Sequence, residues 1–208
     1  MFKILSNIAS IIFHPLAMPT IIYMIILMVF PYEETLINPN AIIYVLILVA
    51  ITTGIVPAIA IYILYTFGLI SSINLEKRAD RLLPNLISIS LYGITSFLFY
   101  SKLGFRGVMI YAIVCFTATL FIITIITLIW KISVHACAMG GVVGFLFSIM
   151  YVSQKTQALL VPSCLSTIFL GLLMSARMYL GCHTSKQVWA GALLGIISGF
   201  VTIFFITT

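Results

Sequence analysis

The sequence predicts an all-α fold, a polytopic bundle of six to seven transmembrane helices. Of the 208 residues, 63% are hydrophobic and only 7% are charged, and the mean hydropathy is +1.28. A soluble domain has about 25% charged residues, so cytosolic globular proteins and nucleic-acid binders are excluded. The apolar residues also form runs of about 20, as one helix needs to cross a bilayer core, and not the alternating segments of a β-barrel. Residues 1–208 are expected to be a single integral membrane domain surrounded by membrane lipids.

Seven apolar runs, separated by charged and turn-forming residues, are expected to be spans. The first run continues without a charge to Tyr32, which is too long for the apolar region of a signal peptide, so we expect it to be retained. The count falls to six if Leu86–Tyr100 is only a re-entrant piece. The expected spans are Ser10–Phe30, Ala41–Tyr65, Leu86–Tyr100, Val108–Trp130, His135–Tyr151, Ala158–Met174 and Val188–Ile206.

Two spans have small residues at every fourth position, a spacing that lets helices approach closely within lipid. We expect these faces to serve packing inside the bundle. They consist of Gly191, Gly195 and Gly199 in the last span, and of Ala136, Gly140 and Gly144 in an earlier one.

The predicted topology divides the charged residues unequally between the two membrane faces. One face receives seven basic and two acidic residues, and the other receives three basic and two acidic residues. The positive-inside rule assigns the more basic face to the cytoplasm, unless these cations bind an anionic substrate. The more basic face carries Lys3, Glu76–Arg81, Lys131 and Arg177–Lys186.

Three polar segments return to this same face, because two spans separate each segment from the next. They are Glu76–Pro84, Lys131–His135 and Arg177–Gln187. Arginine offers planar, bidentate donors to phosphate oxygens, and the helix start at Ser133 offers backbone amides to an anion. Of the two histidines in these segments, one can attack phosphorus while the other protonates the leaving oxygen. The pattern predicts phosphoester cleavage.

No metal or other cofactor is expected. Four carboxylates in the whole chain disfavour an oxygen-ligated Mg²⁺ site. The four cysteines form no C-x-x-C pair and are expected to pack as small apolar residues. The predicted cleavage is therefore metal-independent.

The polar segments resemble the motifs of the type 2 phosphatidic acid phosphatases, a superfamily of lipid phosphatases and vanadium haloperoxidases. The third motif of that family, S-R-x5-H-x3-D, is matched by Arg177, His183 and Gln187 at the same spacing. The second, P-S-G-H, is matched by Ser133 and His135. The first, K-x6-R-P, is degenerate: Lys77 and Arg81 precede Pro84 at a different spacing. Three positions depart from the family pattern, namely Gln187 in place of the acid, Val134 in place of glycine and Ala176 in place of serine.

This resemblance implies a helical core like that of the family and a role for each matched residue. His183 would be the nucleophile that forms a phosphohistidine, His135 the general acid, and Gln187 the residue in the position of the orienting acid. Without that acid the protein is either a slow phosphatase or an impaired relative that only binds phospholipid heads. The expected phosphate-binding residues are Arg177, Ser133, Arg81 with Lys77 or Arg78, and Lys131, which lies beside the second motif but matches no motif position.

Several of these residues also have a structural interpretation. Ser133 could only cap its helix, and Thr184-x-x-Gln187 fits a capping box that secures the last helix. The Lys77–Arg81 cluster could bind lipid headgroups, and His14 is expected to be a hydrogen-bonded packing residue. A small transporter is a further alternative, disfavoured because no charged residue falls near the midpoint of a span.

The sequence thus predicts a multi-pass protein of the bacterial inner membrane whose substrate is a lipid phosphate or an isoprenoid pyrophosphate. The family resemblance places the site on the periplasmic or lumenal side, whereas the charge count places it in the cytoplasm. Both orientations stay open at this point, as does the oligomeric state.

Overall fold

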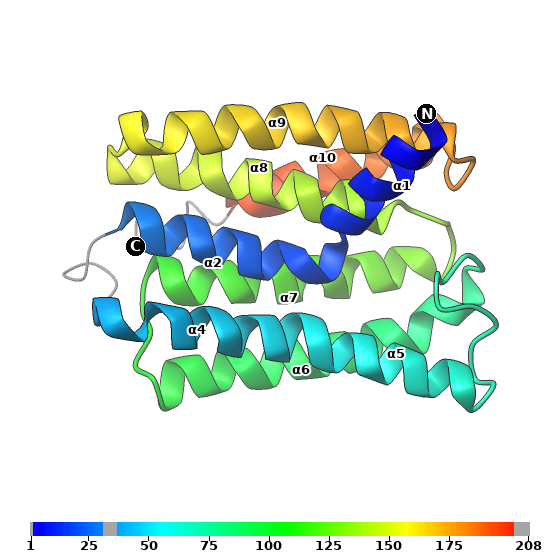
Figure 1. The fold of residues 1–208 in the computed structure, drawn as a ribbon, viewed down its shortest axis with the longest axis horizontal. Coiled ribbons are helices and arrows are strands. Elements are labelled where there is room, and N and C mark those ends of the chain that lie inside the picture. Colours follow the sequence, from blue (N-terminus) through cyan, green and yellow to red (C-terminus); the bar gives the residue numbers. More distant parts are fainter. Residues whose placement is uncertain (1, 31–36, 202–208) are drawn as a thin grey trace.

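The computed structural model describes residues 2–30 and 37–201, and every regular element within these ranges is helical. Apart from α1, which runs obliquely, the α-helices lie side by side along one axis (Figure 1). They are α1 (Phe2–Ile12), α2 (Met18–Val29), α4 (Ile42–Val49), α5 (Val56–Thr66), α6 (Leu82–Ser101), α7 (Val108–Thr127), α8 (Val134–Ser153), α9 (Thr156–Tyr179) and α10 (Ser185–Val201).

Six segments of the described chain are long and apolar enough to cross a bilayer, which confirms the multi-pass membrane fold. Leu86–Tyr100 lies within the 20-residue helix α6, so it is not a short re-entrant piece. The last predicted span is helical over the 17 residues of α10, and its expected end at Ile206 lies outside the described residues, as do Pro31, Glu33 and Glu34. The six segments are Phe2–Val29, Pro39–Thr66, Ala79–Ser101, Val108–Thr127, Val134–Ser153 and Thr156–Tyr179.

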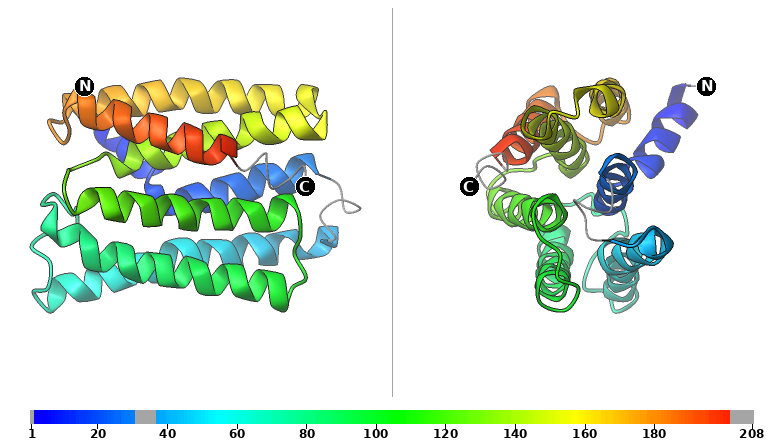
Figure 2. Two further views of the ribbon diagram at one scale, coloured as in Figure 1. Left: turned by 180° about the vertical axis from the view of Figure 1, so that it is seen from behind. Right: turned by 90° about the vertical axis from the view of Figure 1, so that its left-hand side faces the viewer.

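Helix α8 is the most buried of the six apolar segments. Two thirds of its apolar window (67%) is buried inside the protein, compared with 22–39% for the other five segments. The end-on view shows α8, α9 and α10 as one group, and α2, α4–α5, α6 and α7 as the other (Figure 2). Fully buried side chains between the two groups include Ile22, Ile26, Met109, Ile113 and Leu146.

The predicted small-residue faces pack against each other, because α8 and α10 are in close contact along their length. A Cβ atom added at Gly140 would lie 2.5 Å from the carbonyl oxygen of Ala192. At Gly195 it would collide with the carbonyl oxygen of Cys137, and at Gly144 with that of Ile196. These backbones approach as closely as only glycine allows, so the prediction of close packing is confirmed.

The first predicted span is not one continuous helix, because the chain breaks at His14. A proline disfavours the helical conformation of the residue before it, and His14, which precedes Pro15, is extended with ψ 138°. Helix α1 therefore leaves the axis of α2 (Figure 1) and packs against α9. The ring of Phe13 lies 4.8 Å from that of Phe169.

The second irregularity is the π-helical turn Ala50–Ile55, which connects α4 to α5. Pro57 has no N–H to donate to the carbonyl of Thr53 four residues earlier. The Tyr92 hydroxyl donates to that carbonyl instead, at 2.9 Å, and fixes α6 against the bend.

Candidate functional site

The three polar segments of the sequence lie at one end of the bundle, as predicted (Figure 1). The loop between α5 and α6, the start of α8, and the turn between α9 and α10 form this end, and α1 begins beside them. Side chains that are far apart in the sequence can therefore act on one ligand here.

His183 lies in the turn between α9 and α10, and its side chain is only 7% exposed. Its Nδ1 atom lies 3.1 Å from Oε1 of Gln187. The backbone N–H of Thr184 donates to the same Oε1 at 3.2 Å, which identifies this atom as the amide oxygen and not the amide nitrogen. An oxygen can only accept, so the imidazole carries its proton on Nδ1, and Nε2 keeps its lone pair.

The side chain of Gln187 therefore makes the contacts that both of its expected roles require. Gln187 is the third residue of α10, and its bond to Thr184 N–H is one half of a capping box. Its bond to His183 is the orienting contact that the resemblance implies, although an amide replaces the acid.

The surroundings of His183 keep its imidazole neutral. Burial, followed by the charge of Arg81, lowers its pKa from about 6.5 to about 4. The bond from Gln187 acts in the opposite direction, and Arg177 and Lys131 lower the pKa further. At neutral pH His183 is thus an uncharged base with a free lone pair.

Ser133 is fully buried and caps α8, since its Oγ accepts from the N–H of Ala136 at 3.4 Å. Its own N–H donates to the backbone oxygen of Gln187 at 3.2 Å, which joins the second polar segment to the third. The structure thus gives Ser133 the capping role, and its contact with phosphate stays a prediction.

Arg81 joins the first segment to the second. The side chain is 7% exposed, Nε donates to Leu75 O at 2.9 Å, and Nη1 donates to Ile132 O at 3.0 Å. Among the described residues nothing accepts from Nη2, so its two hydrogens and the second hydrogen of Nη1 remain for a ligand. Hydrogen bonds thus connect Arg81, Ile132–Ser133, Gln187 and His183 in one series.

Arg177 lies in the last turn of α9, and its guanidinium group is incompletely paired. Its Nη1 donates to Ser10 Oγ at 3.4 Å. Its buried Nε has no hydrogen-bond partner in the described part of the chain. A buried N–H without a partner is rare in folded proteins and calls for an explanation, and an anionic ligand would supply one.

His135 lies in the first turn of α8, within electrostatic reach of both Arg177 and His183. The backbone carbonyl of Ser10 lies within hydrogen-bond reach of its imidazole. The ring of His14 stands edge-on to that of His135, with centroids 5.3 Å apart. The elements that carry the two predicted catalytic histidines, the start of α8 and the turn between α9 and α10, lie at the same end of the bundle, and His14, which follows α1, contacts His135.

The remaining predicted cations divide into two groups. Lys131 is half-buried and within electrostatic reach of His183. Lys77 and Arg78 are exposed on the loop before α6. Among the described residues, Arg78 bonds only through its backbone oxygen, which accepts from the N–H of Arg81, and neither side chain has a hydrogen bond or ion pair. The structure therefore does not bring these two cations into the cluster. The nearby carboxylate of Asp80 accepts from the N–H and hydroxyl of Ser71 and not from a histidine.

Sequence reasoning missed Ser10 and His14. His14 is hydrogen-bonded, as expected, since its Nδ1 accepts from the N–H of Leu16, but the break at Pro15 leaves its side chain exposed beside His135 and not packed in the interior. The His-Pro dipeptide in the middle of an apolar run was the available signal, since it predicts a helix boundary within the first span.

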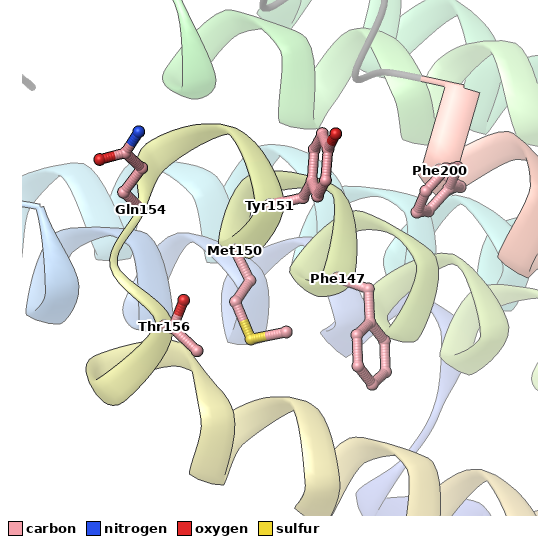
Figure 3. A pocket seen from close by; sticks show the side chains of 6 residues that line it. All are labelled: Phe147, Met150, Tyr151, Gln154, Thr156 and Phe200. Atoms are coloured by element: carbon pink, nitrogen blue, oxygen red, sulfur yellow. The ribbon is translucent and has the colours of Figure 1, made fainter.

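A separate pocket of about 390 Å³ lies at the opposite end of α8 (Figure 3). At about 1.5 Å per residue, its lining residues from Phe147 to Gln154 lie roughly 18–28 Å along the helix from His135. Apart from Gln154 and Thr156 its lining is hydrophobic or aromatic, and no titratable group of the cluster belongs to it. Its lining residues are Phe147, Met150, Tyr151, Gln154, Thr156 and Phe200.

Within the described ranges, no three His, Cys, Asp or Glu side chains lie together in a group that could hold a metal ion. The cluster consists of imidazoles, guanidinium groups and an ammonium group, a set suited to an anion. Comparisons with protein-family models, with curated proteins and with solved structures find no match. The likeness to the type 2 phosphatidic acid phosphatases therefore depends on the quoted motifs alone.

Proposed function

We propose that the protein is a membrane-embedded, metal-independent phosphatase that acts on a lipid phosphate or isoprenoid pyrophosphate through a phosphohistidine. The observation that carries this proposal is the tautomer of His183. With its proton held on Nδ1 by Gln187, the imidazole presents the lone pair of Nε2, which is what a nucleophile needs.

The cations around His183 support an anionic substrate. Arg81 has hydrogens without a described acceptor, Arg177 has a buried Nε without one, and Lys131 adds a third positive charge. Preorganised donors of this kind stabilise the charge that develops on a phosphoryl group during transfer. The donor set, rich in cations and poor in carboxylates, also favours a reaction without a metal ion.

The proposed reaction has two steps. Nε2 of His183 attacks phosphorus, the N–P bond forms as the P–O bond to the leaving group breaks, and His135 gives its proton to the leaving oxygen. Water then attacks the phosphohistidine, His135 takes a proton from this water, and phosphate leaves as the N–P bond breaks. No cofactor is needed.

A second candidate function is a phospholipid-binding relative without turnover. The observation that favours it is Gln187, because a neutral amide cannot stabilise, as a carboxylate would, the positive charge that the imidazole acquires when Nε2 bonds to phosphorus. The same cations would hold the lipid head in either case.

The proposed setting is the bacterial inner membrane, with the lipid head among the cations and its tail in the bilayer. The proposed substrate side is the periplasm, by resemblance to the family. If the site faces the periplasm, the basic residues on this face bind substrate, and the positive-inside rule does not apply to them.

The test is phosphate release by the purified protein from phosphatidate, farnesyl phosphate and farnesyl diphosphate, with and without EDTA. We expect release that persists in EDTA and that vanadate inhibits, with His183→Ala as the inactive control. Activity that disappears in EDTA and returns with Mg²⁺ contradicts the metal-free reaction. Binding of these lipids without release supports the second candidate.

A further inference from the structure

The break between α1 and α2 brings a third imidazole to the site. His14 is exposed, and its ring centroid lies 5.3 Å from that of His135. Arg177 is within electrostatic reach of the same ring. The nearby Ser10 accepts from Arg177 and presents its carbonyl to His135, so α1 forms one wall of the site.

The tautomer of His14 is also fixed by the backbone. The N–H of Leu16 donates to Nδ1 of His14 at 3.3 Å, as part of the cap on the short turn Pro15–Ala17. An imidazole nitrogen that accepts carries no proton, so the neutral ring has its proton on Nε2. No described residue accepts from this Nε2–H, and the exposure of the side chain leaves it open to a ligand.

The position of His14 assigns it to one part of the substrate. Since His135 is the proposed donor to the leaving oxygen, a group beside His135 lies on the leaving-group side. An alcohol leaving group has no oxygens there besides the one that His135 protonates. A phosphate leaving group has additional, negatively charged oxygens that an Nε2–H can bind.

We propose that His14 binds the leaving phosphate of a lipid diphosphate, so that the site prefers lipid diphosphates to lipid monophosphates. This inference rests on the proposed phosphatase function. The site contains the positive charges of Arg81, Arg177 and Lys131, and the nearby carboxylate of Asp80 is bonded to Ser71. That surplus matches the larger negative charge of a diphosphate.

The first step is the same as in the proposed reaction, with a lipid monophosphate as the leaving group. Nε2 of His183 bonds to the terminal phosphorus, the bond from that phosphorus to the bridging oxygen breaks, and His135 protonates this oxygen. The lipid monophosphate departs, and His14 donates a hydrogen bond to one of its other oxygens without giving up its proton.

Three substitutions at His14 separate its cap from its proposed ligand contact. His14→Ala removes both. His14→Asn keeps an acceptor at the place of Nδ1, because asparagine also caps such turns, but removes the donor at the place of Nε2. His14→Gln puts an amide N–H near the place of Nε2. Ile11→Ala, at a 72% exposed position of α1, is the matched control.

The measurement is kcat/KM for farnesyl diphosphate divided by that for farnesyl monophosphate, which share one tail. His14→Ala and His14→Asn should lower this ratio about ten- to a hundredfold, as loss of a hydrogen bond to a charged group predicts. His14→Gln should retain more of it, and Ile11→Ala all of it. A parental ratio in His14→Asn together with a reduced one in His14→Ala shows that His14 only caps the turn and overturns the inference.

Binding of uncleavable analogues tests the inference apart from turnover. Farnesyl methylenediphosphonate should bind the parent more tightly than farnesyl phosphonate, and His14→Asn should remove most of the difference. If the parent cleaves neither lipid but this His14-dependent difference persists, the phosphatase proposal fails and the diphosphate site stands. Equal affinities of parent and His14→Asn for the diphosphonate overturn the diphosphate site.

Discussion

Nδ1 of His183 lies 3.1 Å from Oε1 of Gln187, and the N–H of Thr184 donates to the same oxygen. One amide oxygen thus caps α10 and fixes the tautomer of the proposed nucleophile. The start of the last helix and the reactivity of the histidine before it depend on the same side chain.

Substitutions of Gln187 should separate these two roles. Gln187→Leu removes the acceptor, so kcat should fall about 10- to 100-fold, as is typical when an orienting partner is lost. Gln187→Asp restores a carboxylate that stabilises the imidazolium, so it should keep or raise kcat and raise the pKa of His183. The measurement is kcat against pH for the three proteins, with melting temperature as the control. Parental rates in both variants, with a loss of thermal stability only, would show that Gln187 is a helix cap.

The depressed pKa of His183 predicts activity that extends far into the acid range. The nucleophile must be neutral, so kcat/KM should fall only as pH drops through about 4 and not near 6.5. Stability should follow the same sign: the unfolded chain takes up the proton first, so the contribution of this histidine is complete above pH 6.5 and is lost as pH falls towards 4. An acid limb near pH 6.5 would contradict the buried, cation-flanked position of His183.

Removal of one neighbouring charge tests the cause of that shift. Because the charge of Arg81 is the largest cause after burial, Arg81→Gln should raise the pKa of His183. An NMR titration of the labelled imidazole measures this even where turnover is weak. Lys77→Gln is the matched control, since Lys77 is exposed on the same loop and should leave the titration unchanged.

The helices were predictable, because apolar runs of membrane length are a local property of the sequence. The grouping of the three polar segments at one end was also predictable, because it follows from the number of spans between them. The bond between His183 and Gln187 follows from their spacing at the start of a helix. The close packing of the small-residue face of α10 was also predictable, because the four-residue spacing of its glycines is visible in the sequence.

The wall formed by α1 was not predictable to the same degree. The direction of α1 depends on packing against α9, where Phe13 meets Phe169, and no local pattern predicts so distant a contact. The prediction that Lys77 and Arg78 join the phosphate-binding cluster failed for the same reason, because it too depended on tertiary packing. Charge alone predicted that they would bind phosphate, whereas the turn before α6 buries only Arg81.

The two proposed catalytic histidines should respond differently to the leaving group. His183→Ala removes the nucleophile and should abolish turnover of every substrate, and Arg177→Ala should remove nearly all of it. His135→Ala should cost about 10²- to 10⁴-fold for a poor leaving group and much less for p-nitrophenyl phosphate, whose leaving oxygen needs little protonation. Equal losses in His135→Ala across leaving groups of different pKa would contradict its assignment as the acid.

Close packing of α8 on α10 gives the prediction that depends least on function. A Cβ at Gly195 meets the backbone oxygen of Cys137, which cannot rotate away as a side chain can. Gly195→Ala should therefore destabilise the protein by about 1–3 kcal/mol, the usual cost of overpacking. Gly171→Ala is the control within a helix, because nothing lies within 4 Å of its added Cβ, and alanine favours the helix by up to about 1 kcal/mol. Melting temperatures in detergent should fall for Gly195→Ala and hold or rise for Gly171→Ala. Equal melting temperatures of both variants would mean that α8 and α10 are farther apart than their glycine faces indicate.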